Sequence, residues 1–104
     1  MQPLLLPGWY GVYLDLGHKY RESHLCAPAV AAYRDALARK PDVALGRAGL
    51  TACLLELGDY PAARREARLG YATGGMAPTF RYMSRVADSA LTARRPGADS
   101  GGRR

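Results

Sequence analysis

The chain has 104 residues, of which 48% are apolar, and 15 Lys and Arg against 9 Asp and Glu give a formal net charge of +6. This length and apolar content predict one compact domain with one modest core. The sequence has no run of about 18 apolar residues, which excludes a transmembrane helix, and its opening residues lack the basic segment of a signal peptide. We therefore expect a cytoplasmic protein.

Composition divides the chain into three parts. Residues 1–8 contain two prolines among leucines and predict an extended arm, which either packs over the first helix or lies in an interface. Residues 9–93 carry helical periodicity and form the predicted domain. Residues 94–104 hold four Arg against one Asp among Pro, Gly and Ser, which predicts a disordered basic tail. Half of the net charge lies in this tail.

Apolar residues at intervals of three and four predict five helices joined by short connections, with no alternating pattern that would indicate a strand. The expected ranges are about 9–21, 28–40, 44–57, 60–72 and 78–93. We expect Asp42 and Asp59 to cap the third and fourth helices at their first turns. Gly58 and the pair Gly74 and Gly75 are expected to end the same two helices. Such short connections favour antiparallel neighbours.

The first helix pair contains an internal pattern that recurs. It reads Tyr13-x2-Leu16-Gly17-x2-Tyr20, followed by Ala29-x3-Tyr33-x2-Ala36 and Pro41. This resembles the tetratricopeptide repeat (TPR). A shift of 34 residues gives a weaker second copy, in which the signature positions hold Arg47, Thr51, Ala67 and Gly70.

The resemblance implies an all-α, right-handed array of two TPR-like helical hairpins. We expect the fifth helix to cap that array through an apolar stripe made of Phe80, Met83, Ala87, Ala90 and Leu91. An unrelated small helical bundle is the alternative.

The same resemblance implies a protein-binding module whose first helices form a concave groove for a peptide or helix of a partner. The groove positions would be Leu14, His18, Arg21, Leu45, Ala48, Ala52, Leu55, Tyr82 and Val86. Because most of them are small or apolar, they disfavour a carboxylate clamp and favour an apolar or amphipathic segment. Leu45, Leu55 and Val86 fit a core position equally well. If Phe80 aligns with Tyr13, Arg81 and Arg85 face the groove instead.

The kind of partner is addressed by a narrower resemblance. The small size, the Leu-rich opening before Trp9 and the repeat type resemble TPR chaperones of bacterial type III secretion, which implies a secreted subunit as partner. An uncovered groove would favour a homodimer.

The rival interpretation is a basic strip that binds nucleic acid or an acidic partner. The strip would consist of Arg64, Arg65, Arg68, Arg81 and Arg85, with Tyr71, Tyr82 and the tail. A solvated outer face, broken by Glu66 and Asp88, is the favoured interpretation, so we expect no nucleic acid.

Residues suited to catalysis or metal binding are few. His18 and Glu22 share a helix face, with Asp15 and His24 nearby, and a surface pair is the favoured interpretation. The cysteines lack a CxxC or paired His spacing, so Cys26 and Cys53 are expected to be buried apolar residues rather than a disulfide scaffold or a zinc finger. With no catalytic motif present, we expect a protein that is not an enzyme and has no cofactor or metal.

Overall fold

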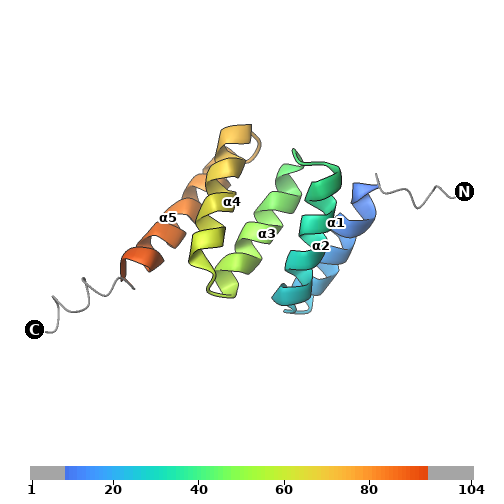
Figure 1. The fold of residues 1–104 in the computed structure, drawn as a ribbon, viewed down its shortest axis with the longest axis horizontal. Helices are drawn as coiled ribbons and strands as arrows, with labels where there is room; N and C mark the ends of the chain where they lie inside the picture. Colours follow the sequence, from blue (N-terminus) through green and yellow to red (C-terminus); the bar gives the residue numbers. More distant parts are fainter. Residues whose placement is uncertain (1–8, 94–104) are drawn as a thin grey trace, which may run out of the picture.

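A computed structural model describes residues 9–93, which form five helices (Figure 1). These are α1 (Tyr10–Glu22), α2 (Cys26–Arg39), α3 (Ala44–Glu56), α4 (Tyr60–Thr73) and α5 (Ala77–Ala93). No strand occurs within the described range, so the predicted all-α array of helical hairpins is confirmed. The extended arm predicted for residues 1–8 and the disordered tail predicted for residues 94–104 lie outside the described residues.

The helix bounds repeat with the period found in the sequence. α1 and α3 begin 34 residues apart, at Tyr10 and Ala44, and α2 and α4 begin 34 residues apart, at Cys26 and Tyr60. Each helix packs against the next, and α1 and α5 also contact α3 (Figure 1). Within residues 9–93, no helix has the length and apolarity that would allow it to cross a membrane.

Local signals account for the start of α4 and for the ends of α3 and α4. A carboxylate oxygen of Asp59 accepts a hydrogen bond from the Ala62 amide at 3.3 Å, which confirms the predicted cap of α4. Gly58 and Gly74 have φ angles of +81° and +110°, which glycine adopts without steric cost. The predicted cap at Asp42 is wrong, because Val43 directly precedes α3 and the Asp42 carboxylate instead pairs with Lys40 at 3.0 Å.

Tyr33 of α2 fills the space between the first helices of the two hairpins. Its side chain is fully buried and faces two glycines, Gly17 of α1 and Gly49 of α3. A Cβ atom at Gly17 would lie 2.7 Å from Cδ1 of Tyr33, and one at Gly49 would lie 2.6 Å from its hydroxyl. Both glycines are therefore required by close approach of a ring rather than by a turn.

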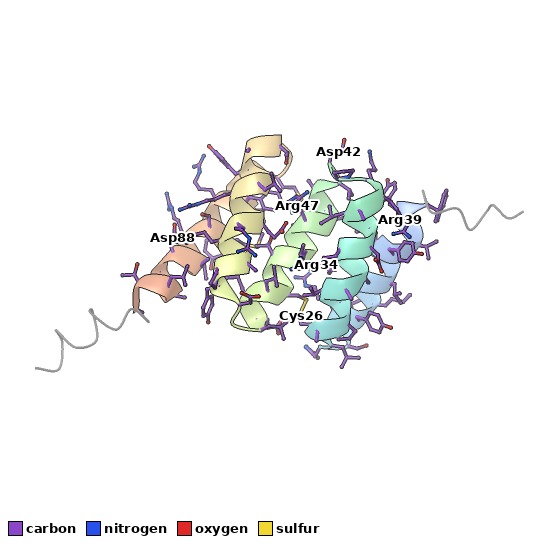
Figure 2. The ribbon with its side chains drawn as sticks, viewed as in Figure 1. Cys26, Arg34, Arg39, Asp42, Arg47 and Asp88 are labelled. Carbon is purple, nitrogen blue, oxygen red and sulfur yellow. A yellow bond between two sulfur atoms is a disulfide. The ribbon has the colours of Figure 1, made fainter. Side chains whose placement is uncertain are left out.

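The second hairpin lacks aromatic residues that the first hairpin has at matching positions. Where the first hairpin has Tyr13, the second has Arg47, which is buried and donates a hydrogen bond to Glu66 of α4 at 2.6 Å (Figure 2). Where the first has Tyr33, the second has Ala67, which packs in one apolar cluster with Phe80 of α5. Phe80 is fully buried, and a Cβ atom at Gly70 would lie 2.6 Å from its Cδ1.

This aromatic residue also seats α5 as the cap of the array. Phe80, Met83 and Ala87 are buried, and Ala90 and Leu91 are half-buried. The predicted apolar stripe is therefore the face that packs, and α5 covers α4 and part of α3.

The two cysteines join the hairpins. Cys26 at the start of α2 and Cys53 near the end of α3 are buried, as predicted, but they form a disulfide, which was not predicted (Figure 2). Their Cα atoms lie 5.1 Å apart although they are 27 residues apart in sequence. The pairing depends on how α2 packs against α3, and cysteine spacing alone does not report that.

Candidate functional site

A cavity of about 210 Å³ lies where α1, α3 and the start of α5 meet. Its lining residues are His18, Arg21, Leu45, Ala48, Gly49, Ala52, Met76, Thr79 and Met83. The structure thus brings together residues from three helices that are far apart in the sequence. Five of them are predicted groove residues: His18, Arg21, Leu45, Ala48 and Ala52. We call this cavity the groove.

The floor of the groove comes from one stripe of α3. This stripe starts at Leu45 and continues three, four and seven residues later with Ala48, Gly49 and Ala52. Residues at these spacings share one face of a helix. The three small residues leave the hollow, whereas the larger Leu45 is 52% exposed at its side. An apolar hollow of this kind gains free energy when a partner covers it.

The opposite wall belongs to α5 and the turn before it. Met83 is buried and Met76 is 38% exposed, and both line the groove. Met76 has a φ of +61°, an unusual backbone conformation for a residue with a side chain. Methionine adapts its shape to different apolar partners because its side chain is unbranched and flexible.

Four predicted groove residues lie elsewhere. Leu14 and Leu55 are half-buried and pack against the core. The core has one apolar cluster around Tyr33 and a second around Phe80, and Leu55 packs against both clusters. Tyr82 and Val86 line a separate hollow of about 580 Å³ whose lining residues all belong to α5. The rotation of α5 differs from the expected one, with Phe80 turned toward Gly70 of α4. Thr79 and Met83 take the groove positions, and sequence reasoning had assigned Met83 to packing alone.

The polar end of the groove is formed by α1. Nδ1 of His18 hydrogen-bonds with the buried hydroxyl of Tyr33 at 2.7 Å, and burial raises the pKa of that hydroxyl from its ordinary value. The tyrosine thus remains a neutral hydrogen-bonding partner at neutral pH. His18 and Arg21 also line a second cavity of about 340 Å³ together with Glu22, His24 and Glu56. The apolar groove is therefore flanked by a polar cavity that shares two of its residues.

The predicted basic strip is only partly assembled. Arg68, Arg81 and Arg85 line a cavity of about 180 Å³ between α4 and α5 with Tyr71 and Ser84. The alternative helical register would have turned Arg81 and Arg85 toward the groove, and the structure does not place them there.

Acidic and aromatic neighbours reduce the strip's free charge. The Arg81 guanidinium lies 5.6 Å from the centre of the Tyr71 ring. Asp88 pairs with Arg64 at 3.4 Å and with Arg68 at 3.6 Å. This carboxylate offsets part of the positive charge that an anion would use.

Of the four residues considered for acid–base or metal chemistry, three meet in the polar cavity. His18, Glu22 and His24 line it, whereas Asp15 is exposed on α1 and does not. Arg21 and Glu56 complete the lining of this cavity. Glu56 comes from the end of α3, and no local sequence pattern links it to the residues of α1. Comparison of the chain with protein-family models, with curated proteins and with solved structures gives no match.

Proposed function

We propose that the protein is an interaction module that binds an apolar or amphipathic segment of a partner protein in the groove. The observation that supports this most directly is the shared lining: small and apolar residues of α3 lie opposite Met76 and Met83, with His18 and Arg21 at one end. Helix-in-groove recognition uses an apolar floor of this kind with polar groups at its edge.

The size of the groove limits what it holds. Small-molecule sites commonly measure about 300–1,000 Å³, whereas this groove measures about 210 Å³. A hollow of this volume suits one or two apolar side chains of a peptide, with the rest of the segment lying across Leu45. The resemblance to small TPR chaperones of type III secretion extends the proposal: the partner would be a secreted subunit held before export.

The test compares two leucines of nearly equal exposure. Leu45 lines the groove and is 52% exposed, whereas Leu69 on α4 is 48% exposed and does not line it. Tagged wild-type protein and the variants Leu45→Glu and Leu69→Glu are used to capture partners from the native host in moderate and high salt, followed by mass spectrometry. We expect one protein that resists high salt, is lost with Leu45→Glu and is kept with Leu69→Glu.

One outcome of this capture experiment contradicts the groove as the binding site. If both variants retain that protein equally, the groove is not the binding site. Leu55→Glu is unsuitable here because Leu55 packs against both core clusters, so the change would lower stability before it tested binding.

A second candidate function rests on the cavity between α4 and α5. Three arginines and Tyr71 line it, an arrangement that suits a phosphate or carboxylate group next to a stacking surface. Binding of this kind weakens steeply with salt. Capture that disappears in high salt, after nuclease treatment or in an Arg81→Gln, Arg85→Gln variant would favour this surface over the groove.

A further inference from the structure

Two sulfurs and one carboxylate come together where the two hairpins meet. The sulfurs of Cys26 and Cys53 and a carboxylate oxygen of Glu56 all lie within 4.8 Å of one another. Oε1 of Glu56 is 3.1 Å from the Cys26 sulfur. Both cysteines are buried, whereas Glu56 is exposed and also lines the polar cavity. Glu56 therefore lies between the two buried sulfurs and the polar cavity.

His24 offers a nitrogen on the same side, but its ring lies outside the group of three ligand atoms, so the ring has to move inward to become a fourth ligand. It lines the polar cavity together with Glu56 and stands two residues before Cys26. Its φ of +62° belongs to the turn between α1 and α2, which is held by a 2.9 Å hydrogen bond from the His24 amide to the Arg21 carbonyl. The ligand types therefore come in two short pairs, His24-x-Cys26 and Cys53-x2-Glu56. Ligand pairs in structural zinc sites usually have about two to five intervening residues, a spacing that Cys53 and Glu56 have and that His24 and Cys26 fall short of by one residue.

The position of Glu56 fits the reduced cysteines better than the disulfide. A disulfide sulfur carries no proton, so it has nothing to donate to a carboxylate 3.1 Å away. A Cys26 thiol would donate to Glu56, and a metal held by the thiolate would take the same carboxylate as a ligand. Cys26 is also the first residue of α2, where the helix dipole favours negative charge.

We propose that the reduced form of this pair binds one Zn²⁺ through the two thiolates, Glu56 and His24. A dithiol or phosphine reductant supplies two electrons, and with two protons the S–S bond becomes two S–H groups. Zn²⁺ then displaces those two protons and forms two Zn–S bonds. Two thiolates and one carboxylate around Zn²⁺ leave one negative charge, and Arg21 lines the same cavity as a counter-charge. Disulfide and metal are alternative links between α2 and α3, independent of what the groove binds.

The experiment uses the full chain and Co²⁺ as a spectroscopic probe, followed by Zn²⁺. Protein reduced with a phosphine is titrated with Co²⁺ under inert gas while thiolate-to-cobalt charge-transfer absorption and visible ligand-field bands are recorded. We expect saturation at one Co²⁺ per chain, displacement by Zn²⁺, and no charge-transfer band in protein whose disulfide is intact. Absence of the band in the reduced protein, or an equal band in the oxidised protein, overturns the proposal.

Variants then test the ligand set. Glu56→Gln and His24→Ala change exposed residues, and each should weaken Co²⁺ binding by at least about 10-fold. Glu22→Gln is the matched control, because Glu22 lines the same cavity and is not a proposed ligand. Cys53→Ser should weaken the charge-transfer band, because only the Cys26 thiolate remains, with circular dichroism confirming that the helices persist. If Glu22→Gln weakens binding as much as Glu56→Gln, the proposed coordination is wrong.

Discussion

The Tyr33 ring requires glycine at positions 17 and 49, because it occupies the space that a Cβ atom at either position would need. At Gly49 this space is closed by the Tyr33 hydroxyl, which hydrogen-bonds with His18 and so cannot shift freely. We expect Gly49→Ala to lower the free energy of unfolding by about 1–3 kcal/mol through overpacking. That loss outweighs the gain of up to about 1 kcal/mol from replacing glycine in a helix. Chemical denaturation followed by circular dichroism measures it.

Gly11 provides the control for this prediction. A Cβ atom there would meet only the Trp9 ring, at 3.6 Å, which is ordinary contact. Gly11→Ala should therefore leave the free energy of unfolding unchanged or raise it. Equal losses at Gly11 and Gly49 would mean that the packing of Tyr33 is not what requires glycine.

A second residue-scale prediction concerns the buried ion pair. The side chains of Arg47 and Glu66 are 9% and 18% exposed, and Arg47 also donates to the Pro41 carbonyl at 2.8 Å. Arg47→Met leaves the Glu66 carboxylate without its partner, and we expect the free energy of unfolding to fall by roughly 3 kcal/mol. The double variant Arg47→Met, Glu66→Leu should recover part of this loss in denaturation experiments. A double variant that is less stable than Arg47→Met alone would contradict this explanation.

At the scale of elements, the helices and their period follow from local pattern, because caps, glycines and apolar spacing act over a few residues. Asp59 and Gly58 illustrate this, since each acts within one turn of its own helix end. Asp42 shows where prediction from local pattern fails. Its carboxylate suits both a cap of α3 and an ion pair with Lys40, and the structure contains the ion pair. The disulfide lies beyond that limit, because it depends on which ends of α2 and α3 meet.

The groove shows the same division between local and distant causes. Leu45, Ala48 and Ala52 line it as predicted because the stripe of α3 continues the repeat pattern. Tyr82 and Val86 do not line the groove. The rotation of α5 depends on the Phe80 ring, which packs beside Gly70 of α4. The repeat pattern does not encode that contact between α4 and α5.

Phe80 makes this contact testable. It is fully buried beside Gly70, so Phe80→Ala should lower the free energy of unfolding by about 3–5 kcal/mol. Tyr82→Ala is the control on the same helix, because Tyr82 is 67% exposed and should change stability by no more than about 0.5 kcal/mol. Thermal and chemical denaturation of both variants distinguishes these effects. Similar losses from the two changes would place α5 in a different rotation.

At the scale of the whole molecule, α3 links the two ends of the array. Within residues 9–93, α1 and α2 contact α3 but neither α4 nor α5 (Figure 1). In such an array stability is close to a sum of the units and the interfaces between neighbours. The first hairpin therefore depends on its interface with α3, and the Cys26–Cys53 disulfide crosses that interface.

Reduction of the disulfide should consequently weaken the two ends unequally. With the cysteines 27 residues apart in sequence, the chain-entropy model gives a loss of about 3–4 kcal/mol in the free energy of unfolding. We expect hydrogen exchange, measured with a chelator present, to show lower amide protection in α1 and α2 after reduction, with α4 and α5 changing less. A Cys26→Ser, Cys53→Ser variant should match the reduced protein with or without reductant. A uniform fall in protection would instead show one cooperative unit, in which the disulfide stabilises all five helices alike.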